Sequence, residues 1–238
     1  MSEDADPGDV APAERPARPF WVAVAVNVVA ALVIVSLVQA FLVRVHSVSS
    51  GSMEQTLAVT DRVLSSRLPY LTSPPARGDI VIFGHGTTWD AAVLPPDPNP
   101  LKQALRQFGN VTGIGISDTS YTVKRVLGVG GESVGCCDAA GRVQVNGVAL
   151  DEPYVYEDLP FEAGVRDCTT VPHSPRCFAP IAVPAGKLLL LGDHRSGSAD
   201  SVVGCRSDAA ASDCARLVDV TRVTGKVIAR AWPPGPVG

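Results

Sequence analysis

The hydrophobic positions divide the chain into one long apolar run near the N-terminus and a series of short apolar runs after it. The long run, FWVAVAVNVVAALVIVSLVQAFLV, covers residues 20–43, has no charged residue and is polar only at Asn27, Ser36 and Gln39. About twenty apolar residues in an α-helix cross a bilayer, so the run predicts a transmembrane helix. A secretory signal peptide is the alternative. The run is longer than a typical signal-peptide core and no A-x-A-like cleavage site follows closely, which favours a retained anchor.

The segments that flank this run indicate its orientation. Residues 1–19, MSEDADPGDVAPAERPARP, are rich in Pro, Ala and acidic residues, which predicts a disordered tail. Arg15 and Arg18 precede the run and Arg44 follows it, so the positive-inside rule favours a cytoplasmic N-terminus. We therefore expect residues 1–19 to be cytoplasmic and residues 44–238 to form an extracytoplasmic domain.

After the span the apolar runs are short and turn signals separate them, which predicts a mainly β domain. The stretch GRVQVNGVAL alternates apolar and polar residues around an Asn-Gly pair at 146–147, which predicts a β-hairpin. One short helix is expected at LKQALRQF, residues 101–108. Runs with the length and the Val, Ile and Leu content of strands occupy residues 76–83, 121–129, 187–191 and 224–232.

The composition agrees with a β-rich, loop-rich protein that has enough apolar residues for a core. The 238 residues include 22 Gly and 20 Pro, and hydrophobic residues make up 46% of the chain. The formal net charge is -4 and no basic stripe is present. A nucleic-acid partner is therefore not expected.

Cysteines occur in three close pairs, none of them in a C-x-x-C arrangement, and the four histidines do not cluster with them. We therefore expect no zinc or other metal site. Two pairs have nine-residue spacing within polar, loop-like sequence, which predicts local disulfides in an oxidising compartment. Reduced, buried thiols are the alternative, and the sequence does not fix the connectivity. The disulfide candidates are Cys168, Cys177, Cys205 and Cys214, and the remaining pair is Cys136 and Cys137.

The stretch GESVG, residues 131–135, matches the G-x-S-x-G pattern of a nucleophile elbow and makes Ser133 a candidate nucleophile. A turn with Gly and Cys and then a hairpin follow it, where an elbow requires a helix. No histidine is well placed as a partner. We therefore interpret Ser133 as a turn residue.

The histidines do not predict a metal site or a catalytic triad. Their spacings match neither a metal-ligand pattern nor a Ser-His-Asp pattern. Asp193 and His194 are adjacent, but neighbouring residues on a strand point to opposite faces, which makes them poor partners. The four histidines are His46, His85, His173 and His194.

A lysine within an apolar strand is a candidate base. A serine hydroxyl becomes a useful nucleophile when a base takes its proton. Lysine can do this if burial lowers its pKa from the ordinary value of roughly 10.4. Lys124 and Arg125 lie within YTVKRVLGV and face opposite sides of the predicted strand, so one of them faces an interior. A charge that protects an edge strand is the alternative explanation for Lys124.

Four stretches follow the span in a characteristic order: SGSMEQTL at 50–57, RGDIVIF at 77–83, YTVKRVLGVGGE at 121–132 and GDHRSGSADS at 192–201. This set resembles the bacterial type I signal peptidases, serine proteases with a Ser–Lys dyad. The resemblance implies a mainly antiparallel β catalytic domain with a smaller β extension, here residues 133–186.

The resemblance also implies a role for individual residues. Ser52 would be the nucleophile and Lys124 the general base. Ser50 would lend its hydroxyl to the oxyanion hole, beside the backbone N–H of Ser52. Ser198 would orient the lysine, and Asp200 would support the dyad.

Two positions depart from the family pattern. Gln55 stands where Pro is most frequent, which should only loosen a turn. Val202 stands where Arg usually follows the Asp-Ser pair, so Asp200 needs another partner, and Arg195 and Arg206 are the candidates.

The resemblance implies a membrane-bound endopeptidase that needs no cofactor and cleaves exported pre-proteins after small residues at positions −3 and −1. Residues 44–51 span at most roughly 29 Å when extended, so Ser52 would work close to membrane lipid. Two alternatives stay open. One is a self-cleaving cytosolic Ser–Lys protease of the repressor type, and the other is a non-catalytic, disulfide-stapled ectodomain that binds a partner.

Overall fold

The structure is a computed structural model that describes residues 19–85, 89, 98–112, 121–206 and 210–237. The predicted disordered tail lies almost entirely outside these residues. The chain divides into two compact units, residues 1–35 and residues 36–238, and each is described separately below.

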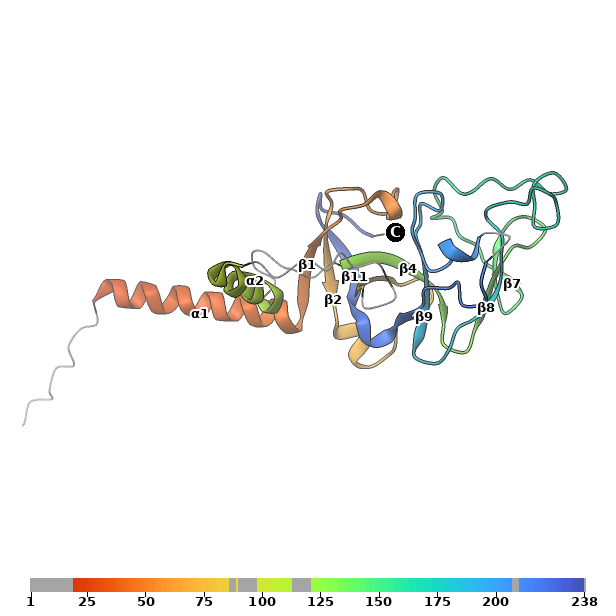
Figure 1. Ribbon diagram of the computed structural model, residues 1–238. Coiled ribbons are helices and arrows are strands. Elements are labelled where there is room, and N and C mark those ends of the chain that lie inside the picture. The colour runs from red at the N-terminus through yellow and green to blue at the C-terminus, as the bar shows by residue number, and fades with distance from the viewer. Residues whose placement is uncertain (1–18, 86–88, 90–97, 113–120, 207–209, 238) are drawn as a thin grey trace, which may run out of the picture. The chain divides into compact units, whose positions relative to one another are not determined.

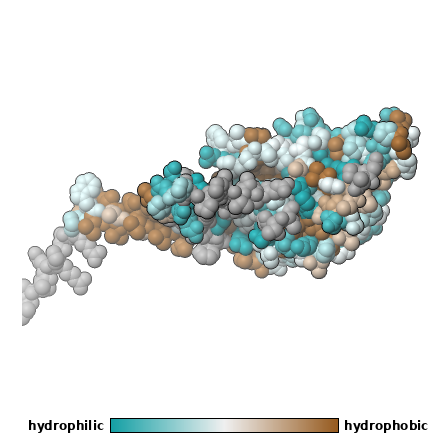
Figure 2. Space-filling view, viewed as in Figure 1, coloured by the Kyte–Doolittle hydropathy of each residue, from teal (hydrophilic) through white to brown (hydrophobic). Residues whose placement is uncertain are grey.

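The predicted transmembrane run forms the helix α1, Phe20–Phe41 (Figure 1). Its window Phe20–Gln39 has a mean hydropathy of 2.7, and none of the described residues in that window is buried. Figure 2 shows the resulting apolar surface in brown. The helix is therefore long and apolar enough to cross a membrane. It is shorter than the predicted run, because Val43 already belongs to the first strand.

Seven antiparallel strands form the larger sheet, in the order β1-β2-β11-β3-β4-β9-β10. The last strand in the sequence, β11, lies inside the sheet and pairs with β2 on one side and β3 on the other. The strands are β1 (Val43–Ser47), β2 (Arg62–Ser66), β3 (Ile80–Gly84), β4 (Tyr121–Val129), β9 (Lys187–Leu191), β10 (Val218–Asp219) and β11 (Val223–Trp232).

The smaller sheet has the order β7-β6-β5-β8 and is also antiparallel. Asn146 and Gly147 join β6 to β7 with φ angles of 52° and 77°, as a two-residue hairpin turn requires. The predicted hairpin is thereby confirmed. Ser133 begins a strand, so its interpretation as a turn residue was wrong. The strands are β5 (Ser133–Cys136), β6 (Val143–Val145), β7 (Val148–Ala149) and β8 (Phe178–Ala182).

The helices outside α1 are short. The predicted helix at 101–108 is part of α2, Pro100–Thr112. The other helical segments are single 3-10 turns that connect strands. They are η1 (Gly51–Met53), η2 (Leu68–Leu71), η3 (Val203–Cys205) and η4 (Val220–Arg222).

Strand β9 explains how an almost unbroken leucine run folds as a strand. Leu188 and Leu190 join the apolar cluster on one face of the large sheet, and Leu189 and Leu191 join the cluster on the other face. Successive side chains of a strand alternate between faces, so both faces are covered here. Strand β4 pairs with β9 and is also buried on both faces, with Val126 in the first cluster and Leu127 in the second.

All six cysteines form disulfides. The bonds Cys168–Cys177 and Cys205–Cys214 join the pairs that the spacing predicts. The third bond joins the neighbours Cys136 and Cys137, for which the sequence suggested no pairing.

Candidate active site

The candidate nucleophile, Ser52, lies in the 3-10 turn η1 between β1 and β2. Its neighbour Met53 is 1% exposed and belongs to the core cluster that also contains Leu57. These apolar side chains fix the turn against the sheet, and Ser52 itself is buried. The backbone of Gln55 has a φ of 69°. The proline ring cannot adopt this angle, so a proline at position 55 would require this turn to change.

Lys124 lies on β4, between β3 and β9, with Val81 opposite it on β3. It is therefore inside the sheet, which excludes the edge-strand explanation for its charge. The side chain is buried, and its Nζ atom donates a hydrogen bond to Oγ of Ser52. The fold thus brings together the two residues of the predicted dyad.

Burial is the main reason why the pKa of Lys124 is lower than that of an ordinary lysine. Removal from water lowers the pKa of Lys124 to about 8, because a buried ammonium loses its hydration. The charges of Asp200 and Asp193 oppose this effect and Arg216 adds to it. Near pH 8 a large fraction of the lysine is therefore neutral and able to accept a proton.

Ser50 extends the dyad toward the surface. Its Oγ atom lies 3.2 Å from Oγ of Ser52, within hydrogen-bond distance, and its side chain is exposed. Ser50, Ser52 and Lys124 consequently form a continuous line of polar groups from solvent to the buried amine.

Gly192 allows β9 to end directly against the nucleophile turn. A Cβ atom at this position would contact the carbonyl oxygen of Ser52 and the hydroxyl of Ser198. Ser198 is therefore next to the dyad segment. Its buried Oγ makes no hydrogen bond to any described residue, so its role in orienting Lys124 stays a prediction.

Asp200 is fully buried, and the structure identifies its partner. Nη2 of Arg206 lies 3.3 Å from its Oδ2 atom, and the backbone N–H of Val202 donates to Oδ1 over 3.2 Å. Of the two candidate partners, Arg206 is the one used. Arg195 pairs with Glu152, with Nη2 and Oε1 2.5 Å apart.

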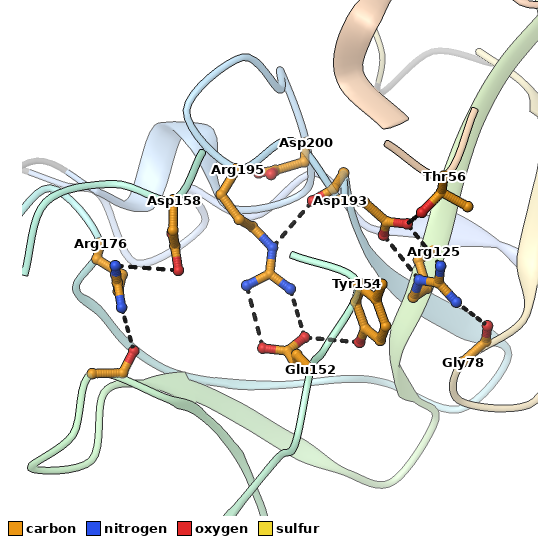
Figure 3. Close-up of polar contacts among 12 residues, drawn as sticks. Thr56, Gly78, Arg125, Glu152, Tyr154, Asp158, Arg176, Asp193, Arg195 and Asp200 are labelled. Carbon is orange, nitrogen blue, oxygen red and sulfur yellow. Dashed lines mark hydrogen bonds and ion pairs between the residues drawn. The ribbon is translucent and has the colours of Figure 1, made fainter. Parts of the chain in front are cut away.

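A further buried ion pair, which was not predicted, joins Arg125, the residue after Lys124, to Asp193 (Figure 3). Arg125 donates from Nε and Nη2 to the two carboxylate oxygens of Asp193, over 2.9 and 2.7 Å. Thr56 donates to the same carboxylate over 2.6 Å. Both charged residues are buried, and the contacts tie β4 to the nucleophile segment and to the end of β9. The sequence signal was the second cation of the Lys-Arg pair, which also needs a buried partner.

Residues of the loop that follows β7 complete this network. Glu152, which accepts from Arg195, also accepts a hydrogen bond from the hydroxyl of Tyr154 over 2.9 Å. The guanidinium of Arg125 stacks over the ring of Tyr154, 3.8 Å from its centroid, a favourable cation–π contact. These contacts connect strand β4 and the loop after β9 to the loop after β7 (Figure 3).

One histidine also touches the site. Nδ1 of His194 lies 3.1 Å from the carbonyl oxygen of Gly51, and its backbone N–H donates to the carbonyl of Ser52 over 3.2 Å. Its neighbour Asp193 points to Arg125, so the adjacent pair has separate partners, as expected. Among the described residues, no histidine belongs to a group with metal-binding geometry.

The chain is similar to one known protein family and to several proteins of that family. A protein-family model described as "Signal peptidase, peptidase S26" matches residues 21–232. A signal peptidase I of Mycobacterium tuberculosis (strain CDC 1551 / Oshkosh) is 31% identical over 216 residues, which are 88% of this chain and 72% of the relative. A probable signal peptidase I of Mycobacterium leprae (strain TN) is 32% identical over 209 residues, 82% of this chain and 70% of the relative. A solved signal peptidase I of Enterococcus faecalis V583 aligns with a TM-score of 0.36 and 20% identity, over 65% of this chain and 97% of that chain.

Proposed function

Since the chain belongs to the signal peptidase family, peptidase S26, we propose that it is a membrane-bound signal peptidase with a Ser–Lys dyad. Family membership supports a peptidase that removes signal peptides. The observation that supports the Ser–Lys dyad is the hydrogen bond from buried Lys124 to Ser52. Ser52 is the nucleophile and Lys124 the general base.

In the proposed reaction, neutral Lys124 accepts the proton of Ser52 while Oγ attacks the scissile carbonyl carbon. The oxyanion that forms accepts hydrogen bonds from the backbone N–H of Ser52 and the hydroxyl of Ser50. Donors held in place before the reaction are worth roughly 3–4 kcal/mol in acyl transfer. Lys124 then protonates the amine that leaves as the new N-terminus of the mature protein.

The remaining acyl-enzyme is an ester between Ser52 and the carboxyl end of the signal peptide. Lys124 is neutral again and takes a proton from a water molecule, which attacks the ester carbonyl. Collapse of the second tetrahedral intermediate releases the signal peptide and returns the proton to Ser52. Ser198 has a positioning role in the proposal, because it lies against Gly192 next to the Ser52 turn. Asp200 also has a positioning role, because its charge interacts with Lys124.

The proposed setting is the outer side of a cell membrane. The apolar helix α1 supports an anchor, and the three disulfides support an oxidising compartment for residues 44–238. The tail 1–19 is then cytoplasmic. The substrates are exported pre-proteins with small residues at positions −3 and −1, held near the lipid surface by their own signal segments.

The test is cleavage of a purified pre-protein by the full chain in detergent or lipid. Ser52→Ala and Lys124→Ala should each abolish cleavage, whereas Lys187→Ala, which removes a partly exposed ion pair with Asp219, should leave it unchanged. Cooperative thermal unfolding and a native near-UV circular dichroism spectrum would exclude a folding defect. Cleavage by Lys124→Ala at the wild-type rate would exclude the dyad. A folded wild-type chain that cleaves only itself would favour the self-cleaving protease. A folded chain that cleaves no pre-protein but binds a specific partner would favour the non-catalytic ectodomain.

A further inference from the structure

A cavity of about 580 Å³ lies beside the small sheet, and five of the residues that line it are cysteines. Its volume is in the range of small-molecule sites. The proposed peptidase chemistry uses none of its lining. The cysteines that line it are Cys136, Cys137, Cys168, Cys177 and Cys205.

Two of the disulfides approach each other closely at this cavity. The Sγ atoms of Cys137, Cys168 and Cys177 all lie within 4.8 Å of one another. Cys137 belongs to the bond with Cys136, whereas the other two form their own bond. Cys168 is exposed, Cys137 is half-buried and Cys177 is buried. A sulfur released from the Cys168–Cys177 bond therefore lies within 4.8 Å of Sγ of Cys137, so a short side-chain movement brings it to the other bond.

We propose that the Cys136–Cys137 and Cys168–Cys177 bonds form one thiol–disulfide exchange site that reacts with a low-molecular-weight thiol. The thiolate attacks exposed Cys168, forms a mixed disulfide with it and releases Cys177 as a thiolate. Cys177 then attacks Cys137, so that a Cys137–Cys177 bond forms and Cys136 leaves as a thiolate. This is the ordinary course of disulfide exchange, with one bond made for each bond broken.

A second small thiolate completes the reaction. It attacks the small-molecule sulfur of the mixed disulfide, releases Cys168 as a thiolate and forms the oxidised disulfide of the small thiol. Two small thiolates have then lost two electrons, and the protein has exchanged two disulfides for one. Cys136 and Cys168 take their protons from water.

The rearranged bond has a structural advantage over the vicinal one. A Cys136–Cys137 bond closes no loop, whereas a Cys137–Cys177 bond joins distant segments of the small sheet. Cross-links that close longer loops restrict the unfolded chain more. The small sheet consequently keeps a long-range cross-link after the site has taken up two electrons.

The experiment uses the full chain in detergent at pH 8 with increasing reduced glutathione. Samples are quenched with acid, alkylated at low pH and digested with pepsin for disulfide mapping by mass spectrometry. We expect the first reduced species to carry a Cys137–Cys177 bond with alkyl groups on Cys136 and Cys168. The Cys205–Cys214 bond, whose sulfurs are outside the cluster, should stay intact at the same concentration.

The double variant Cys136→Ser, Cys137→Ser is the matched control. In it, Cys177 has no second protein disulfide to attack, so it returns to Cys168 and expels glutathione unless a second glutathione resolves the mixed disulfide first, and net loss of the Cys168–Cys177 bond should be slower than in the wild type. Three results would overturn the proposal. One is independent reduction of the two bonds with no Cys137–Cys177 product. The others are formation of that product only in denaturant, and resistance of both bonds to glutathione until the protein unfolds.

Discussion

Lys124 donates a hydrogen bond from Nζ to Oγ of Ser52, although the two residues are 72 positions apart in the sequence. Ser52 is 6% exposed and Lys124 only 2%. A buried ammonium is costly, which favours the neutral amine, and in that state the same contact can also form with the Ser52 hydroxyl donating to Nζ. The same burial that holds the pair together prepares it for proton transfer.

Cleavage should depend on pH through Lys124. Its pKa of about 8 means that the base is protonated, and unable to accept a proton, at lower pH. We expect kcat/KM to fall about tenfold for each pH unit well below 8 and to level off above it. Initial rates between pH 5 and pH 9.5 would measure this. A flat profile over that range would contradict lysine as the base.

The same pKa predicts how the lysine affects stability. The folded-state pKa is below the unfolded value, so the unfolded chain binds more protons between about pH 8 and 10.5. Stability therefore rises with pH across this window, and below it the full cost of the buried ammonium remains. Replacing Lys124 by Met should raise the free energy of unfolding at pH 7 by up to about 3 kcal/mol.

Denaturant unfolding of Lys124→Met and the wild-type chain, at pH 7 and at pH 10, would check this. The difference between them should shrink at the higher pH. Lys226→Met offers a control, because Lys226 is only partly buried and pairs with Asp79. A variant that is less stable than the wild type at pH 7 would show that Lys124 contributes more through its contacts than its burial costs.

The sequence predicted those parts of the fold that depend on local pattern. Strand β4 has the predicted bounds, because its apolar run ends in a Gly-rich turn. Strand β9 likewise covers the whole KLLLL run. The Asn146–Gly147 turn was readable because its φ angles restrict the residues that can occupy it. Within the site, the motif resemblance was sufficient to select Ser52 and Lys124.

Features that depend on contacts between distant segments could not be predicted. Arg125 and Asp193 are separated by 68 positions, and neither local propensity nor periodicity identifies such a partner. Arg206 was only one of two candidates for Asp200, since Arg195 lies five positions before the aspartate and Arg206 six positions after it, both in polar loops. The spacing of cysteines in loops could not predict the Cys136–Cys137 bond, because these two cysteines are adjacent and no loop separates them.

Ser50 should matter for the reaction and not for the fold. Its exposed hydroxyl lies 3.2 Å from Oγ of Ser52, where it can donate to a developing oxyanion. Ser50→Ala should lower kcat by about 100-fold to 1,000-fold with little change in KM, as for other single oxyanion donors. Ser49→Ala, an exposed neighbour, is the control. A rise in KM alone would instead indicate a substrate-binding role.

The pair of Arg125 and Asp193 should matter for stability. Asp193→Asn leaves a buried guanidinium without its carboxylate, and removing one member of a buried pair costs about 3–5 kcal/mol. Asp219→Asn removes a partly exposed pair with Lys187 and should cost less than about 1 kcal/mol. Denaturant midpoints would compare the two. Equal, small losses would mean that water reaches Arg125 and replaces its partner.

Gly192 should be intolerant of any side chain because of its position against the nucleophile turn. A Cβ atom there would contact the Ser52 carbonyl and would lie 2.6 Å from Cβ of Ser198. The contact with the Ser52 backbone can be relieved only by moving the turn that carries the nucleophile. A misplacement of about 1 Å at a reacting group costs roughly 100-fold in rate, so Gly192→Ala should lose at least that much cleavage.

The control for Gly192→Ala is Gly84→Ala at the end of β3, where a Cβ atom would meet nothing within 4 Å. This second variant should keep wild-type cleavage. Near-UV circular dichroism and thermal unfolding would show whether Gly192→Ala retains its fold. Lost cleavage in a folded Gly192→Ala protein would mean that the approach of β9 sets the position of Ser52. Wild-type cleavage by that variant would mean that the turn can shift without displacing the hydroxyl from Lys124.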